Sequence, residues 1–187
     1  MVFHRRFVSD NELSSEIAPK QTVDTHYDLI TFLAVAQRMQ VNILPITWQS
    51  ARGLVGRGGT SRINEASVDL HTSFAFKCVL NRQKREFPKA KIFQTLISEI
   101  VVLGHPLLRE HPNIVELQGI CWDVPSDEVW PVLVFEKTQF GDLYNFLTLP
   151  VGRDLCTIER LKLCVDIGTA ISDMHFNGRL SAGQQVG

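Results

Sequence analysis

The sequence predicts an α+β fold in which a small antiparallel sheet carries one helix and is followed by one short and one long helix. Three observations lead to this prediction. Short runs of strand-forming residues, separated by glycine and polar turns, lie between residues 53 and 80. Apolar residues recur at helical spacing over 92–103 and again over 157–175. With 187 residues, the chain is long enough for one domain with a hydrophobic core.

Composition excludes several classes of protein. The chain is 44% hydrophobic and 21% charged, which is typical of a globular protein. Its net charge of −1 gives no electrostatic reason to expect nucleic acid or an anionic membrane as a partner. No apolar run reaches the ~18–20 residues of a transmembrane helix, and the N-terminus lacks the apolar core of a secretory signal. We therefore expect a cytoplasmic or nuclear protein, with reduced thiols at four scattered cysteines: Cys78, Cys121, Cys156 and Cys164.

The first 50 residues divide into three parts. Residues 1–23 are polar and have no periodicity, so we expect a frayed arm. Thr25–Gln40 has an apolar face at helical spacing and predicts a helix. Val41–Trp48 contains Pro45, which predicts an extended connection and excludes a central strand.

The stretch from Gly53 to Lys77 has the strongest local signal for function. Four glycines fall within its first seven residues, and clustered backbone N–H groups can bind phosphate. On the loop alone, a polar surface turn and a phosphate site are both open. We expect one strand running into the glycines, a second over Arg62–Val68 and a third over Ser73–Leu80. Lys77 ends an apolar run where a solvated charge is not expected.

A basic linker, Arg82–Lys91, follows the third strand and is expected to be solvated. The helix Ile92–Leu103 comes next. At about 100° per residue, Glu99 falls at the margin of its apolar arc. A carboxylate there either extends to water or meets a buried cation.

The second half of the chain predicts two more strands and two helices. A turn at His111 should lead into a strand at Ile114–Leu117. The remaining expected elements are an antiparallel pair, Cys121–Val124 and Val132–Glu136, joined by Pro125–Asp127; a short helix capped by Asp142 and ending at Leu147; an amphipathic helix, Thr157–His175; and an irregular tail, Gly178–Gly187.

Five features of this sequence stand in an order that resembles the protein kinase family. They are the glycine motif Gly56-x-Gly58-x-x-Ser61-x-Ile63, the strand Phe74-Ala75-Phe76-Lys77, Glu99 placed 22 residues after Lys77, the string His111-Pro-Asn-Ile-Val, and Pro131–Glu136 followed by Gly141-Asp-Leu143. The resemblance covers about Gly53–Gly178. It implies a kinase-like N-lobe, with the 92–103 helix as the helix that family members place against their sheet, and the start of a C-lobe.

The resemblance implies ATP as the ligand. Lys77 would contact the α- and β-phosphates, and Glu99 would orient Lys77 through an ion pair, so these two residues are the candidates for catalytic roles. The other implied contacts are Gly56, Gly58, Gly59, Ser61 and Ile63 in the loop over the phosphates; Ala75 on the adenine ring and Phe135 behind it; and Glu136, Thr138 and Asp142 at the hinge and the ribose.

The sequence departs from the family pattern after Gly178. Met174–Gly178 is similar to the end of the family's long helix, but Ser181-Ala182-Gly183 stands where the catalytic loop should begin. The catalytic aspartate, the Mg²⁺-binding asparagine and Asp-Phe-Gly are missing from this sequence, so no metal ligands are assigned. We expect a truncated gene product or a gene-model fragment with weak, Mg²⁺-insensitive ATP binding and no phosphoryl transfer.

The expected organisation is an arm and helix outside the family core (1–50), a kinase-like N-lobe and hinge (51–140), the start of a C-lobe (141–178) and a tail (179–187). Two functions are open: an ATP-dependent protein kinase by descent that is inactive in this form, and a pseudokinase-like interaction module. A third possibility is an unrelated α+β domain with a chance glycine turn. The interaction module would bind a protein partner through an exposed apolar face of the last helix: Ile158, Leu161, Cys164, Val165, Gly168, Ile171 and His175.

Overall fold

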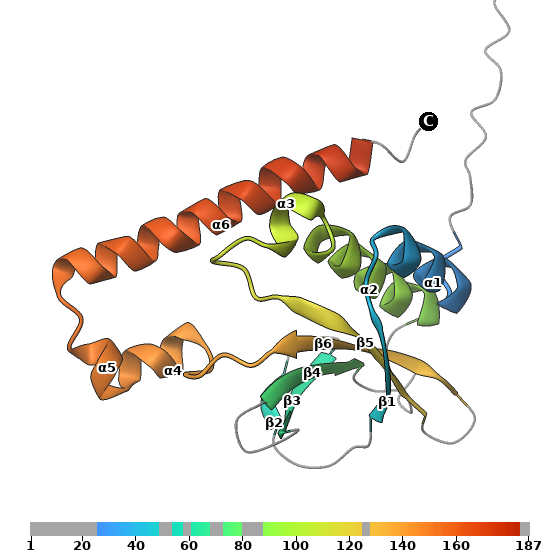
Figure 1. Ribbon diagram of the computed structural model, residues 1–187, viewed down its shortest axis with the longest axis horizontal. Coiled ribbons are helices and arrows are strands. Elements are labelled where there is room, and N and C mark those ends of the chain that lie inside the picture. Colours follow the sequence, from blue (N-terminus) through green and yellow to red (C-terminus); the bar gives the residue numbers. More distant parts are fainter. Residues whose placement is uncertain are drawn as a thin grey trace, which may run out of the picture.

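The computed structural model describes residues 26–48, 54–57, 61–67, 73–79, 88–124 and 128–183. A six-stranded sheet carries helices α1 and α2 on one side, and the long helix α6 crosses beyond the short helix α3 (Figure 1). The expected α+β class is confirmed. Gly58, Gly59, the expected frayed arm, most of the basic linker and the end of the expected tail lie outside the described residues.

Four strands follow the first helix, two helices and two more strands come next, and three helices end the described chain. The helices are α1 (Leu29–Arg38), α2 (Lys89–Leu103), α3 (Pro106–Arg109), α4 (Leu143–Thr148), α5 (Pro150–Arg153) and α6 (Thr157–Gly183). The strands are β1 (Ile43–Trp48), β2 (Leu54–Arg57), β3 (Ser61–Ser67), β4 (Ser73–Val79), β5 (Leu117–Asp123) and β6 (Trp130–Glu136).

The sheet has the strand order β1-β5-β6-β4-β3-β2. The five strands from β2 to β6 pair antiparallel, as expected. β1 adds a parallel edge strand beside β5, so the whole sheet is mixed. Pro45 lies in β1, and an edge is the place where a strand can lack one ladder donor. The expectation that Val41–Trp48 is extended but not central is therefore confirmed.

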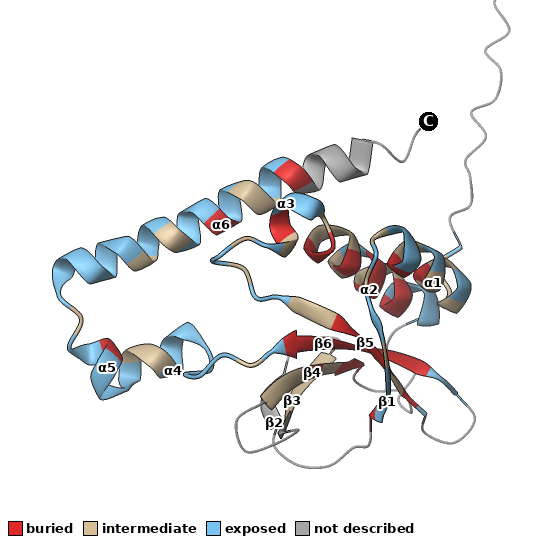
Figure 2. Cartoon of the chain, viewed as in Figure 1, coloured by how far each residue is buried: buried red, intermediate tan, exposed pale blue. Residues whose placement is uncertain are grey.

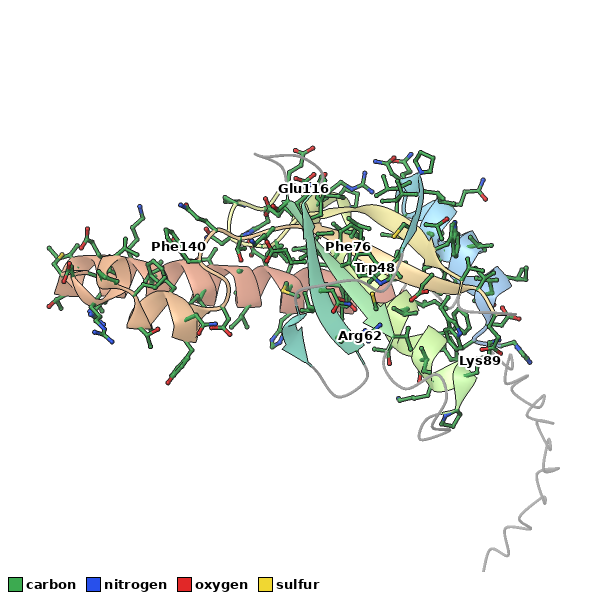
Figure 3. All side chains as sticks on the ribbon, turned by 90° about the horizontal axis from the view of Figure 1, so that it is seen from below. Trp48, Arg62, Phe76, Lys89, Glu116 and Phe140 are labelled. Carbon is green, nitrogen blue, oxygen red and sulfur yellow. The ribbon has the colours of Figure 1, made fainter. Side chains whose placement is uncertain are left out.

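The pleat of the sheet divides its apolar residues between two cores. On the α2 side, Val79 of β4 and Leu133 of β6 pack with residues of α1 and α2, including Phe32 and Phe93. On the opposite side, Trp48 stacks on Phe76 with ring centroids 4.4 Å apart, and the two rings lie together in Figure 3. Both sides of the sheet are therefore covered, each by residues that the N-terminal segment supplies.

A pair of buried thiols belongs to the second core. Cys78 and Cys121 are both fully buried, while Cys156 and Cys164 are exposed. Burial, helped by nearby Cys78 and Asp123, raises the pKa of the Cys121 thiol to about 12. Two of the four cysteines therefore lie in the core.

Several predicted boundaries were wrong. Helix α1 begins at Leu29, where the Asp28 side chain accepts a hydrogen bond of 2.8 Å from the Thr31 amide. Helix α2 begins at Lys89, so the end of the expected basic linker is helical. The strand expected at Ile114–Leu117 begins only at Leu117 and continues through Asp123. These ends are set by caps and strand pairing, which apolar spacing does not report.

Two short helices, α3 and α5, were not expected. Each has proline at its first position, where the missing N–H costs nothing. Helix α6 was expected to end near His175 but continues to Gly183, so the expected irregular tail at 179–183 is wrong. A helix can extend through these residues because no proline interrupts them.

The apolar face of α6 points away from the domain. Ala170 and Asn177 of α6 are buried against the domain. Ile158, Leu161 and Val165 of the apolar face are 60–77% exposed. Leu161 and Ala170 lie nine residues apart, or about 180° around a helix. Figure 2 shows α6 exposed along most of its length. The expected exposure of this face is therefore present in the structure.

Candidate functional site

An ion pair joins the sheet to helix α2 at the position that the sequence singles out. Lys77 Nζ of β4 donates to both carboxylate oxygens of Glu99, at 2.6 Å to Oε1 and 2.7 Å to Oε2. The side chains are 24% and 20% exposed, so the pair is partly shielded from water. Of the two alternatives for Glu99, the structure shows the one in which it meets a cation.

The alternation of β4 places Lys77 on the helix side of the sheet. Phe74 and Phe76 pack with Trp48 in the core behind the sheet. Ala75 and Lys77, which alternate with them along the strand, therefore face α2. Glu99 lies beyond the apolar arc of α2 and reaches Lys77 at the edge of the core. An apolar strand and an apolar helix thus bring two charges together where each compensates the other.

The glycine-containing hairpin lies beside this pair. Gly56 of β2 is opposite Ile63 of β3, and Ile63 is in turn opposite Lys77 of β4. Ser61 lines a small hollow together with Lys77 and Glu99. The described ends of the hairpin are therefore next to the lysine, as the resemblance implies.

The hinge residues follow from the end of β6. Phe135 is the cross-strand neighbour of Ala75, so both lie on the α2 side of the sheet. Glu136 ends the strand, and its amide donates to the carbonyl of Glu116 at 3.2 Å. The chain then leaves the sheet, and the Thr138 hydroxyl donates to the carbonyl of Gly141 at 3.0 Å.

Asp142 has a structural role that the sequence predicted. Its Oδ1 accepts from the amide of Asn145 at 2.7 Å and caps helix α4, which ends at Thr148, one residue past the expected Leu147. Ala75, Lys77 and Phe135 are thus brought to the α2 face of the sheet. Glu136 is opposite Phe74, so its side chain lies on the other face at the end of β6, with Thr138 and Asp142 just beyond.

One ion pair near the hinge was missed by reasoning from the sequence. Lys137, directly after β6, pairs with Glu65 of β3. Glu65 is opposite Ala75 and lies two residues after Ile63, so it shares the face of the candidate site. The alternation along β3 could have placed Glu65 on this face, but nothing in the sequence identifies its partner 72 residues away.

A second missed contact attaches helix α6 to the segment after α3. His111 Nε2 lies 3.2 Å from Asp173 Oδ2, and the Asn113 side chain donates to the carbonyl of Asp166 at 3.3 Å. The carboxylate of Asp173 is therefore engaged in packing α6 against the sheet domain.

Known proteins similar to this chain were found among the curated sequences, although no family model matches. Over 66 residues, it is 36% identical to the probable serine/threonine-protein kinase pats1 of Dictyostelium discoideum, which covers 35% of this chain and 2% of that protein. Over 125 residues, it is 26% identical to the probable serine/threonine-protein kinase PBL17 of Arabidopsis thaliana. That match covers 65% of this chain and 26% of PBL17. The chain carries a protein-kinase-like domain.

Among solved structures, the kinase-like domain is similar to the apo GRMZM2G135359 pseudokinase, with a TM-score of 0.49 and 21% sequence identity. The match covers 66% of this chain and 42% of that one. The matches to the two curated kinases span about a quarter or less of the length of those proteins. Among the helices that the structure describes, none is both long and apolar enough to cross a membrane.

Proposed function

We propose that the kinase-like domain binds ATP, with the adenine at the hinge and the phosphates at Lys77. The observation that carries the proposal is the Lys77–Glu99 pair. Both oxygens of Glu99 hold the ammonium group, so its position is fixed before a ligand arrives. A cation fixed in this way stabilises a polyphosphate without first losing conformational freedom.

The other candidate residues fit the same ligand. Ala75 and Phe135 are neighbours on the α2 face and would contact the adenine ring. The Glu136 carbonyl and the Thr138 amide would hydrogen-bond its edge, and Asp142 would lie near the ribose. Gly56, Gly58, Gly59, Ser61 and Ile63 would form the loop over the phosphates, where glycine permits backbone N–H groups to approach.

We also propose that this chain binds ATP weakly and transfers no phosphoryl group. Ser181-Ala182-Gly183 contains no carboxylate, and the resemblance places the start of the catalytic loop, with its aspartate, there. Helix α6 continues through Ser181–Gly183, where a catalytic loop would begin. Because Lys77 is the cation at the candidate site, binding should not depend on Mg²⁺. We propose in addition that residues 51–140 form the N-lobe and hinge and residues 141–178 the start of the C-lobe. We also propose that the protein is cytoplasmic or nuclear.

A thermal-shift titration with ATP tests the proposal. Wild-type protein should show a rise in melting temperature with nucleotide, because a ligand that binds only the folded state stabilises it. Lys77→Met should abolish that rise. Lys91→Met is the matched control, since Lys91 is an exposed lysine on α2 that contacts Gln94. An equal shift in the Lys77→Met variant would overturn the proposed phosphate contact.

A second candidate function is a non-catalytic interaction module, and the exposed apolar face of α6 favours it. Contiguous exposed apolar side chains on a helix are typical of surfaces that bind a protein partner. ATP binding and partner binding involve different residues and can be tested separately. Absence of an ATP-dependent shift in the folded wild-type protein would favour the interaction module.

A further inference from the structure

Helix α1 lies directly against helix α2, which carries Glu99. Phe32 of α1 is fully buried, and its ring meets Phe93 of α2 edge-on with centroids 6.2 Å apart. Phe93 stacks in turn on Trp130 of β6, at 5.7 Å. Figure 2 shows buried residues gathered where α1 and α2 face each other. One continuous stack of rings therefore connects α1, α2 and the sheet.

Two glycines allow the N-terminal segment to approach this closely. A Cβ on Gly104, at the end of α2, would lie 2.9 Å from the Cβ of Met39. A Cβ on Gly119 of β5 would lie 2.6 Å from the carbonyl oxygen of Asn42. Any side chain at either position would push the segment away, because real Cβ atoms do not approach other atoms at these distances.

Hydrogen bonds fix the same segment at both of these points. Arg109 Nη2 donates to the carbonyl of Met39, and also to the carbonyl of Gly104 at 3.3 Å. The amide of Ile120 donates to the carbonyl of Asn42 at 2.8 Å. The turn after α1 is therefore tied by hydrogen bonds to the end of α2 and to β5.

The contact with α1 lies on a different flank of α2 from Glu99. Phe93 and Glu99 are six residues apart, which places them about 120° apart around the helix axis. Phe93 is turned toward α1, and Glu99 is turned toward Lys77 of β4. Helix α2 is thus held between α1 on one flank and the sheet with its lysine on another.

We propose that residues 26–48 form a brace that fixes α2 and thereby holds Glu99 on Lys77, with Phe32 as the positioning residue. Phe32 touches neither charge, so it acts through Phe93 and the position of the helix. The consequence for ATP affinity rests on the proposed function, but the consequence for the ion pair does not. Removing the Phe32 ring leaves α2 free to shift, and Lys77 then loses its carboxylate partner for part of the time.

Amine labelling of the full chain without nucleotide tests the brace. Lys77 is modified with an amine-reactive ester, and its labelling rate is compared by mass spectrometry with that of Lys137. Lys137 is the internal reference because it is also ion-paired and similarly exposed, but its partner Glu65 is on β3 and does not depend on α2. Global loosening of the fold would raise both rates together, whereas loss of the brace raises only that of Lys77.

The variants are Phe32→Ala, the milder Phe32→Leu, and Ile30→Ala as the control, since Ile30 is a largely exposed residue of the same helix. Phe32→Ala should raise the ratio of Lys77 to Lys137 labelling by roughly fivefold, the low end of typical coupling between sites. Phe32→Leu should raise it less, and Ile30→Ala should leave it unchanged. If Phe32→Ala does not fold, Phe32→Leu carries the test.

An unchanged ratio in a folded Phe32 variant would overturn the brace. ATP affinity measured on the same proteins separates the two proposals. If wild-type protein binds no ATP while the labelling ratio still rises, the brace stands and the proposed function fails. If wild-type protein binds ATP and the ratio does not change, the brace alone fails.

Discussion

Lys77 and Glu99 meet because each is a charge embedded among apolar neighbours, one on a strand and one on a helix. Either side chain alone would be costly to bury, and the pair removes most of that cost. From the apolar pattern alone both alternatives for Glu99 were open, and its association with Lys77 was predicted through the resemblance to protein kinases. The Glu65–Lys137 pair could not be predicted, because each residue lies at a partly exposed position where a charge needs no partner.

Replacing Glu99 by Gln tests the role of its charge at nearly constant volume. The hydrogen bonds from Lys77 to the Glu99 carboxylate are charge-assisted, and such a bond contributes about 1.5 kcal/mol. If Lys77 loses this contribution to its position, ATP affinity should fall roughly tenfold. Fluorescence titration with a labelled ATP analogue measures this. Glu110→Gln, at an exposed position, is the control. Equal affinity in the Glu99→Gln variant and the wild type would show that the carboxylate does not orient Lys77.

The buried thiol of Cys121 predicts a loss of stability at high pH. Burial raises its pKa from 9.0 to about 12 in the folded state. Below pH 9 the thiol is neutral in both the folded and the unfolded chain, so its contribution to stability is fully present there. As the pH rises from 9 toward 12, only the unfolded chain releases the proton, and the free energy of unfolding decreases.

Urea denaturation at pH 8, 9 and 10 measures this effect, with Cys121→Ala compared against Cys164→Ala. The decrease above pH 9 should be smaller in Cys121→Ala, while Cys164→Ala, at an exposed position, should behave like the wild type. Identical pH profiles for all three proteins would contradict the assignment of the alkaline loss to Cys121.

At the scale of elements, apolar periodicity predicted α1, α2 and α6, and alternation predicted β3, β4 and β6. The sequence did not predict where they end. Helix α6 has an exposed apolar face, yet its packed face is formed by Ala170 and Asn177 on the opposite side. Periodicity shows that a helix has an apolar face, but it does not show whether a partner for that face is present.

The exposed face of α6 gives a prediction for paired substitutions. Leu161→Gln with Val165→Gln should lower the binding of a hydrophobic dye while changing the unfolding free energy by less than about 0.5 kcal/mol, as exposed sites usually do. Leu163→Gln is the matched control on the same helix. Leu163 is partly buried, so this change should lower the melting temperature. A marked loss of stability in the double variant would show that the apolar face packs against the domain.

At the scale of the whole molecule, the N-terminal segment contributes to both cores. It was expected to lie outside the family core, and the sequence does predict its helix and its extended strand. Phe32 and Ala36 nevertheless pack with α2, and Trp48 covers the other side of the sheet. Such docking cannot be predicted from sequence alone, because an apolar face does not specify which other face it will contact.

The same limit applies to the candidate site. The strand lysine, the helix glutamate and the hinge could be assigned by their order, because each carries its own local pattern. Their shared face depends on the register of β3, β4 and β6, in which Ile63 is opposite Lys77 and Ala75 is opposite Phe135. Register is fixed by pairing between strands far apart in the sequence, and no local pattern records it.

Calorimetric titration of the full chain with ATP, in buffer with and without Mg²⁺, tests the central claim most directly. We expect saturable binding to a single site in wild-type protein, changed less than about twofold by Mg²⁺, because Lys77 is the cation at the candidate site. Lys77→Met should show no measurable binding, and Lys91→Met should bind as the wild type does. Absence of binding to the folded wild-type protein, or equal binding to Lys77→Met, would contradict the account.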